Sequence, residues 1–233
     1  MKQKRRSFTV YFGGELLSLP HLIGNAWLAE TIYEKSHGRF RSVLPQDSTA
    51  LRGASSRATR DASLRTLVAC DLALFHLDGL APDSAAVAEF MFAKFADIPA
   101  VLLRTDLRHF ADRRTDPWML AASCFPRTAT VVVAGLPDYR AALLRRQRRR
   151  LEPTLHLAGQ HSSAAAQLLC EHIAAQCVRA LDRVRTLEPV LPKYLREEIY
   201  QWLALAPALR GTAKELRKEF ERALERKVER DLL

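Results

Sequence analysis

The sequence predicts an α/β fold: a parallel five-stranded sheet flanked by helices in three layers, of the flavodoxin or Rossmann-like kind, with a C-terminal all-α extension. Short, continuous apolar runs alternate with segments of helical apolar spacing up to about residue 134. Runs of this kind are typical of parallel strands buried on both faces. After about Gly135 only helical spacing continues. We therefore divide the chain into an α/β domain, residues 1–138, and a helical extension, residues 139–233.

The α/β part begins with a strand at 7–12, which we expect to end at Gly13-Gly14. The other expected strands are 41–44, 71–77, 99–103 and 128–134, and the expected helices are about 20–35, 56–68 and 84–96. Pro45 closes the second strand, because proline cannot continue a ladder. Asp83 is well placed to cap the helix at 84–96.

Three helical segments are expected in the extension, at about 161–187, 193–205 and 211–231. In the last one, Leu216, Phe220, Leu224 and Val228 form a narrow apolar stripe. We interpret this segment as an amphipathic helix that docks on the body or on another subunit. Its mixed charges argue against a helix that lies on a membrane surface.

The composition of the 233 residues excludes several classes of protein. With 48% hydrophobic and 27% charged residues, the chain is not disordered. It holds no run of about 18 apolar residues, so we expect no transmembrane helix, and its interrupted N-terminal apolar stretch indicates no signal peptide. The cysteines lie in apolar runs without metal-ligand spacing, which indicates buried thiols in a reducing, cytoplasmic compartment. They are Cys70, Cys124, Cys170 and Cys177.

The formal net charge is +10, and basic residues are densest between Arg140 and Arg150. Two interpretations stay open. The run could contact a phosphate backbone, or it could be a solvated helix end and linker in an arginine-rich chain. We favour the second, because no zinc-finger spacing or RNP-type sequence accompanies the run. We therefore expect neither nucleic acid nor a membrane among the partners.

Polar residues, together with turn-forming glycines and a proline, follow the predicted strands at the carboxyl edge of the sheet, where parallel α/β proteins place their sites. They are Gly13, Gly14, Glu15, Pro45, Gln46, Asp47, Asp78, Gly79, Asp83, Asp106 and Arg108. The set is rich in carboxylates, and no His or Cys joins it, so we predict no metal site. Clustered carboxylates raise one another's pKa and suit acid–base or nucleophilic chemistry.

Glu89 stands out because the surrounding segment, Val87–Ala93, is otherwise apolar. Burying a glutamate is costly unless it is hydrogen-bonded or functional. The alternative is that Glu89 lies on the solvent side of an amphipathic helix, and the sequence leaves both possibilities open. If Glu89 is functional, a carboxylate is a suitable nucleophile at a sugar anomeric carbon, where the transition state resembles an oxocarbenium ion.

Residues 8–134 resemble the nucleoside 2-deoxyribosyltransferase family through a series of short motifs in a fixed order. The motifs are Val10-Tyr11-Phe12-Gly13-Gly14, Pro45-Gln46, Arg60-Asp61, the segment Cys70–Gly79, Asp83-Ser84, Glu89, Pro99 and the segment Arg104–Arg108. The order of these pieces and the spacing between Asp83 and Glu89 carry the resemblance. The helical extension is not covered by it.

The resemblance implies an enzyme that transfers 2-deoxyribose between nucleobases by cleaving the N-glycosidic bond of 2′-deoxynucleosides. Glu89 would attack the anomeric carbon and form a deoxyribosyl ester. Asp61 would handle the proton on the leaving or entering base, and Tyr11 would orient Glu89. These three residues are the expected catalytic group.

The resemblance also implies a binding set and a mode of assembly. Gln46 would contact the base edge, and Asp83 would accept a hydrogen bond from the 5′-hydroxyl, a carboxylate there repelling a 5′-phosphate. The expected substrate-binding residues are Gly13, Gln46, Asp78, Gly79 and Asp83. We expect no cofactor, a nucleoside and a nucleobase as small-molecule partners, and a homo-oligomer in which a neighbouring subunit completes each site.

Several positions depart from the pattern of the family. Ala85 and Met91 stand where the family has glycine, Met119 stands where it has asparagine, and Leu16 or Leu17 replaces a stacking aromatic residue. These departures motivate one alternative, a catalytically weak sensor that binds nucleosides or nucleotides. A second alternative, an N-glycoside hydrolase that acts on nucleosides or nucleotides, stays open because the outcome depends on how well a base excludes water from the ester.

Overall fold

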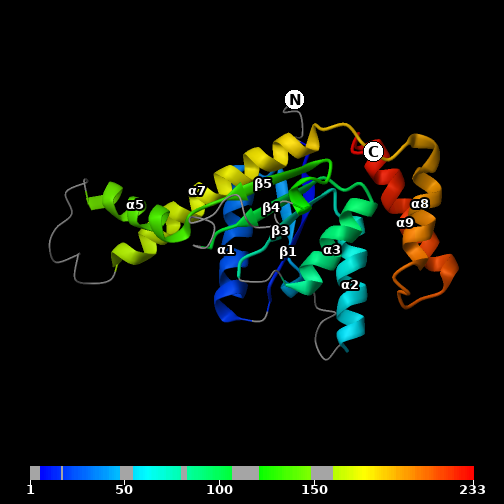
Figure 1. The fold of residues 1–233 in the computed structure, drawn as a ribbon, viewed down its shortest axis with the longest axis horizontal. Helices are drawn as coiled ribbons and strands as arrows, with labels where there is room; N and C mark the ends of the chain where they lie inside the picture. Colours follow the sequence, from blue (N-terminus) through cyan, green and yellow to red (C-terminus); the bar gives the residue numbers. More distant parts are fainter. Residues whose placement is uncertain (1–5, 17, 48–54, 80–82, 107–120, 148–159) are drawn as a thin grey trace.

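Five parallel strands form one sheet in the order β2-β1-β3-β4-β5 (Figure 1). The computed structural model describes residues 6–16, 18–47, 55–79, 83–106, 121–147 and 160–233. The strands are β1 (Phe8–Gly14), β2 (Phe40–Val43), β3 (Leu72–His76), β4 (Ala100–Arg104) and β5 (Thr128–Val132). The predicted parallel α/β fold is confirmed, and the predicted strands differ from the observed ones by one or two residues at their ends.

Strand β1 runs farther than predicted, because Gly13 and Gly14 belong to it and pair with Phe75 and His76 of β3. A Cβ atom on Gly13 would lie 2.7 Å from the Phe75 ring, and one on Gly14 would lie 2.9 Å from the His76 carbonyl oxygen. The two glycines therefore allow a close approach between strands. The strand ends at Gly14, within the expected pair, but it includes both glycines and so runs two residues beyond the predicted range 7–12.

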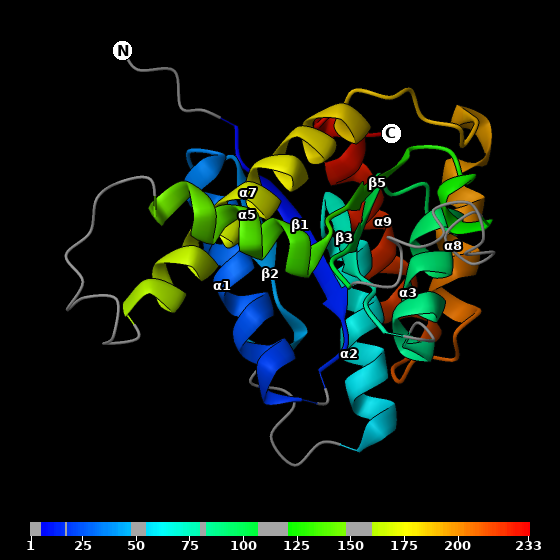
Figure 2. The same cartoon turned by 60° about the vertical axis from the view of Figure 1, so that its left-hand side comes forward.

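Helices α1 (Leu19–Lys35) and α7 (Gln160–Arg185) cover one face of the sheet, and α5 (Gly135–Gln147) packs on α7 (Figure 2). The buried core on this face includes Phe8, Val10, Phe12, Leu28, Ile32, Cys177, Leu181 and Val184. The last three recur at helical spacing on α7, as the sequence predicted. Burial of this stripe holds α7 on the sheet.

Helices α2 (Ser56–Ala69) and α3 (Ser84–Phe95) cover the other face, and α8 (Arg196–Leu205) and α9 (Ala213–Glu229) pack beside them (Figure 1). Phe75 of β3 and Phe90 of α3 meet edge to face with ring centroids 5.7 Å apart. The rest of this core includes Tyr11, Leu67, Leu102, Tyr200, Leu203, Phe220 and Leu224. Residues of α8 and α9 thus share a core with the sheet.

The predicted boundary after residue 138 falls inside α5, which is not among the expected helices with stated bounds but agrees with the favoured interpretation of the arginine run as a helix end. Arg140 lies in this helix, whereas residues 148–150 of the arginine run lie outside the described part of the chain. Two short 3-10 turns complete the described elements, η1 (Pro45–Asp47) and η4 (Lys193–Leu195), and η4 leads into α8. Residues on both sides of the predicted boundary contribute to each core.

Helix α9 docks on the body through an apolar face that differs in one position from the predicted stripe. Leu216, Phe220 and Leu224 are buried, but Val228 is 45% exposed, and Lys227 is buried in its place. The Lys227 ammonium donates a hydrogen bond to the Cys70 carbonyl oxygen. At 3.6 residues per turn, strict four-residue steps drift off the buried face, which explains the difference. None of the described helices is long and apolar enough to cross a membrane.

The cysteines are free thiols, as predicted, but they are not uniformly buried. Cys70 and Cys177 are buried, Cys170 is half-buried, and Cys124 is exposed. Burial raises the pKa of the Cys70 thiol to about 11 and that of Cys177 to about 12. These two thiols therefore act as small apolar side chains at neutral pH.

Candidate active site

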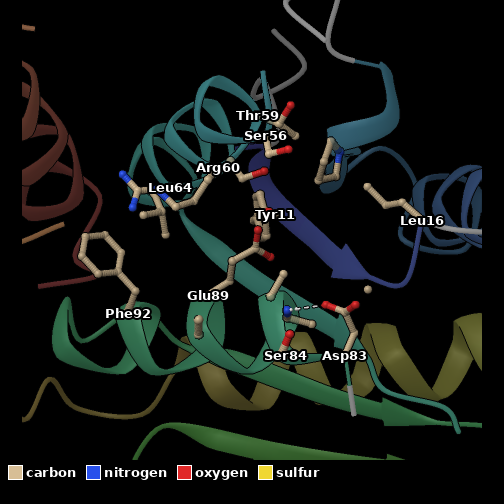
Figure 3. A pocket seen from close by; sticks show the side chains of 16 residues that line it. Tyr11, Leu16, Ser56, Thr59, Arg60, Leu64, Asp83, Ser84, Glu89 and Phe92 are labelled. Atoms are coloured by element: carbon tan, nitrogen blue, oxygen red, sulfur yellow. Dashed lines mark hydrogen bonds between the residues drawn. The ribbon is translucent and has the colours of Figure 1, made fainter. Parts of the chain in front are cut away.

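A cavity of about 670 Å³ lies between α2 and α3 and reaches the carboxyl end of β1 (Figure 3). Its lining residues include Tyr11 and Gly14 of β1, Pro45 after β2, and Asp83 and Glu89 at the start and middle of α3. Strand order reverses between β1 and β3, so chain segments diverge there and leave a crevice, the usual place for a ligand in such sheets.

Glu89 points into this cavity toward Tyr11 (Figure 3). Burial raises the pKa of the Glu89 carboxyl to about 7, and the nearby negative charge of Asp83 acts in the same direction. Tyr11 and Ser63 act in the opposite sense by offering hydrogen bonds to the carboxylate. Glu89 is thus a half-buried acid poised to gain or lose a proton near neutral pH. The solvent-side alternative for Glu89 does not hold.

Tyr11 lies at the base of the cavity and is fully buried. Burial, and then the charge of Glu89, raise the pKa of the Tyr11 phenol well above its usual value. Within the described part of the chain, its hydroxyl makes no hydrogen bond of regular geometry. Its polar neighbours are Glu89 and Ser63, so this neutral hydroxyl remains available to orient the Glu89 carboxylate.

The α2 wall of the cavity carries a polar stripe that the sequence analysis missed. Ser56, Thr59, Arg60 and Ser63 all line the cavity, and because the last three follow Ser56 by three, four and seven residues, the four side chains lie on one helix face. That spacing is the signal that could have found them. The Arg60-Asp61 pair, which the family resemblance singled out, does not reveal this face, because two adjacent helix residues point in different directions.

Asp61 lies on α2 but not among the residues that line the cavity. Its Oδ1 accepts hydrogen bonds from the Arg60 guanidinium at 2.7 and 3.1 Å, and its Oδ2 accepts one from the Arg210 backbone N–H at 3.0 Å. Although burial acts to raise it, these donors hold the pKa of Asp61 below its usual value. The structure therefore does not bring Asp61 together with Glu89 and Tyr11.

Asp83 caps α3 as predicted, accepting a 2.9 Å hydrogen bond from the Ala86 backbone N–H (Figure 3). The cap holds this carboxylate at the rim of the cavity, on the same helix as Glu89. Gln46 lies just after Pro45 and donates from Nε2 to the Leu22 carbonyl oxygen at 2.9 Å. Its Oε1 atom is buried without a hydrogen-bond partner among the described residues.

Asp78 and Gly79 belong to a second polar cluster, at the carboxyl ends of β3 and β4. Asp78 accepts a 2.6 Å hydrogen bond from the Thr105 backbone N–H and lies 3.2 Å from His76 Nε2. Although burial acts to raise it, His76 and Thr105 hold the pKa of Asp78 at about 2. Gly79 has φ of +106°, which favours glycine, and donates to Asp106 Oδ2 at 3.0 Å.

Five of the eight predicted site residues therefore lie away from the cavity lining: Gly13, Gln46, Asp61, Asp78 and Gly79. Gly13 packs against the Phe75 ring. Of the departures from the family pattern, Leu16 and Ala85 line the cavity and Met91 packs partly buried against the core. Leu17 and Met119 lie outside the described residues. Among the described residues no group of three His, Cys, Asp or Glu side chains could hold a metal ion.

No protein-family model and no curated protein matches the chain. Among solved structures, the chain is similar to a conserved protein from Enterococcus faecalis V583, with 24% identity and a TM-score of 0.43 over 62% of this chain and 99% of that one. It is also similar to an oxidoreductase from Corynebacterium diphtheriae, with 11% identity and a TM-score of 0.39 over 77% of this chain and 98% of that one.

Proposed function

We propose that the protein transfers 2-deoxyribose between nucleobases by cleaving the N-glycosidic bond of 2′-deoxynucleosides, with Glu89 as the nucleophile. One observation is the main support for this proposal. Glu89 projects into a 670 Å³ cavity beside the Tyr11 hydroxyl, and its pKa is raised to about 7. A cavity of this size is in the usual range for small-molecule sites.

In the first step, the Glu89 carboxylate attacks C1′ of the nucleoside. A C1′–O ester bond forms, the C1′–N bond breaks, and the departing base takes up a proton from solution. In the second step, a ring nitrogen of the incoming base attacks C1′, the ester bond breaks, and the incoming base loses a proton. Water in place of the second base gives hydrolysis. This sequence divides one difficult displacement into two easier ones.

Tyr11 and Asp83, which line the cavity with Glu89, both support this chemistry. The buried Tyr11 hydroxyl keeps its proton and directs it at the Glu89 carboxylate, which orients the attacking oxygen. Asp83 places a negative charge at the cavity rim. That charge favours a sugar hydroxyl over a phosphate as its neighbour, which supports nucleosides over nucleotides as substrates.

We also propose that copies of the chain associate through the outer face of α1. Leu19, Ile23 and Trp27 recur there on successive turns and are 68%, 57% and 38% exposed, and the space beside Gly24 is open. Exposed apolar patches with an aromatic residue are typical of interfaces. Sedimentation should give an oligomer for the wild-type chain and a smaller species for Ile23→Lys, whereas equal masses would contradict this interface.

The experiment that tests the proposed activity incubates the protein with deoxyinosine, with and without free adenine, and follows both mixtures by chromatography. Deoxyadenosine that appears only with adenine is the expected result. Hypoxanthine released in both mixtures without exchange would make the protein a hydrolase. A folded protein that binds deoxyinosine in a thermal-shift assay but turns over neither mixture would be a sensor, and the proposed transfer would be wrong.

A further inference from the structure

The turn between α8 and α9 is bound to the half of α2 that faces the cavity. Arg57 donates to the Ala208 carbonyl oxygen at 3.0 Å, and Arg60 donates to the Pro207 carbonyl oxygen at 2.9 Å. In the other direction, the Arg210 backbone N–H donates to Asp61 at 3.0 Å. Arg210 also donates to the hydroxyl of Ser55, which caps α2, at 3.4 Å, and Arg65 donates to the Arg210 carbonyl oxygen. These hydrogen bonds connect the C-terminal hairpin to the helix that forms one wall of the candidate site.

Asp61 is the centre of this connection. It is only 5% exposed, and both of its carboxylate oxygens are occupied, one by Arg60 and the other by Arg210. A buried carboxylate whose partners are all in place fixes geometry strongly, because removing one partner leaves a costly unpaired group. The side chain therefore binds the turn to α2 at a defined position.

Arg60 belongs to both the connection and the cavity. Its side chain lines the cavity, but its guanidinium points away from Glu89, toward the hairpin (Figure 3). Asp61 and the Pro207 carbonyl oxygen hold the guanidinium there. One turn farther along the same helix, Ser63 lies beside the Glu89 carboxylate. The position of the α2 wall relative to Glu89 is thus tied to the hairpin.

We propose that the α8–α9 turn is a positioning element of the cavity and that Asp61 is the positioning residue through which it acts, by holding Arg60 outward and the Ser63 face of α2 against Glu89. The inference rests on the proposed function for its kinetic consequence. It gives the C-terminal hairpin, which the family resemblance does not cover, a role in the reaction.

Loss of the connection has two consequences at the site. The Arg60 guanidinium is free to turn into the cavity, where a positive charge lowers the pKa of Glu89. The α2 face also moves relative to the Glu89 carboxylate, and a misplacement of about 1 Å at a reacting centre costs up to roughly 100-fold in rate. A hairpin that only stabilised the fold would produce neither change.

The test compares Asp61→Asn with a matched control, Glu219→Gln. The control removes the 2.9 Å ion pair between Arg65 of α2 and Glu219 of α9, which lies outside the cavity lining. Both substitutions remove one carboxylate charge between the same two parts of the chain. Base exchange is measured as kcat and KM over a range of pH, with hydrogen exchange of the α2 amides measured without substrate.

For Asp61→Asn we expect kcat to fall about 10- to 100-fold, the acid limb of the pH profile to move to lower pH, and amide exchange to rise around Ser63. For Glu219→Gln we expect kcat, the pH profile and the exchange around Ser63 to match the wild type. Equal behaviour of the two variants in all three measurements would overturn the proposal. If Asp61→Asn does not fold, Arg60→Met tests the coupling through kcat and amide exchange around Ser63, since it removes the outward hydrogen bonds and keeps the stem that lines the cavity. It leaves no guanidinium to turn inward, so its acid limb should stay where it is in the wild type.

Failure of the proposed activity is distinguishable from failure of this inference. If the wild-type protein turns over no nucleoside, the proposed function fails. The hydrogen exchange of the α2 amides then decides by itself whether the hairpin is coupled to the cavity. Raised exchange around Ser63 in Asp61→Asn but not in Glu219→Gln would then still support the coupling between the hairpin and the cavity.

Discussion

Two regions of the molecule that enclose acidic side chains surround them with opposite kinds of neighbour. Where the C-terminal helices meet the sheet, Asp97 lies 3.2 Å from the Arg127 guanidinium and accepts hydrogen bonds from the Val190 and Leu191 backbone N–H groups. In the cavity, the groups that influence Glu89 are two hydroxyls and the like charge of Asp83. One acid is neutralised by its neighbours, and the other is not.

The difference in neighbours distinguishes acids that stabilise the fold from an acid that is available for a reaction. Arg60 and Arg210 lower the pKa of Asp61, which keeps that acid ionised and fixed in place. Burial and Asp83 raise the pKa of Glu89 to about 7, which keeps that acid reactive at a cost to stability. A buried charge with full partners organises the fold, whereas a buried charge without a counter-ion marks a functional site.

The largest expected effect is on the reactive acid. Glu89→Gln keeps the size of the side chain and removes the nucleophile, so base exchange should fall by at least roughly 1,000-fold, as removal of a nucleophile does in other enzymes. Chromatographic assay of deoxyadenosine formation measures the loss. Circular dichroism should show an unchanged fold, and Glu225→Gln on the exposed face of α9 is the charge-matched control. An unchanged rate in Glu89→Gln would remove the nucleophile from the proposal.

The next effect concerns the paired acid. Arg127 is 3% exposed and also donates to the Leu232 carbonyl oxygen at 2.7 Å. Arg127→Met should lower the free energy of unfolding by about 3–5 kcal/mol, because it leaves Asp97 buried and unpaired. Urea denaturation measures the change. The double variant with Asp97→Asn should lose less than the sum of the single losses, and strict additivity would contradict the pairing.

Much of the fold could be predicted from the sequence, because continuous apolar runs and helical spacing report burial directly. The exceptions have local causes. Gly13 and Gly14 were predicted to end a strand, although they make room for Phe75 and His76 of the neighbouring strand. Helix α5 was given no bounds in advance because its arginine-rich sequence offers little apolar periodicity. The first difference thus reflects a contact with a distant segment, and the second reflects the composition of the helix itself.

The site was harder to predict than the fold. Glu89, Tyr11 and Asp83 were named from the sequence and line one cavity. Asp61 was named through the family resemblance, but its direction depends on Arg210, 149 residues later in the chain. Ser63 was not named, because a single serine in a helix carries no chemical signal until its neighbours are known. Tertiary partners therefore decide which polar residues face the cavity.

The third expected effect is on the pH dependence of stability. In the folded state the pKa of Glu89 is about 7, whereas its ordinary value is 4.5. The folded protein therefore holds a proton that the unfolded chain releases between these values, and this stabilisation is lost as the pH rises through about 7. A glutamine at this position does not ionise, so Glu89→Gln removes this fall in the free energy of unfolding. The variant should gain roughly 3 kcal/mol over the wild type between acid and weakly alkaline pH, measured by urea denaturation. A constant difference across that range would contradict the raised pKa.

The smallest expected effect concerns the hydroxyl that moderates the reactive acid. Ser63 acts to lower the pKa of Glu89, so Ser63→Ala should raise it further. A hydrogen bond of this kind contributes about 1 kcal/mol, so the acid limb of kcat/KM should move to higher pH by less than about one unit. Ser63→Thr keeps the hydroxyl, so its acid limb of kcat/KM should lie at the wild-type pH. Ser56→Ala removes another hydroxyl from the same cavity wall, two turns away, and should leave the limb where it is. An equal shift in Ser63→Ala and Ser56→Ala would mean that the polarity of the whole wall, rather than one hydroxyl beside the carboxylate, sets the protonation of Glu89.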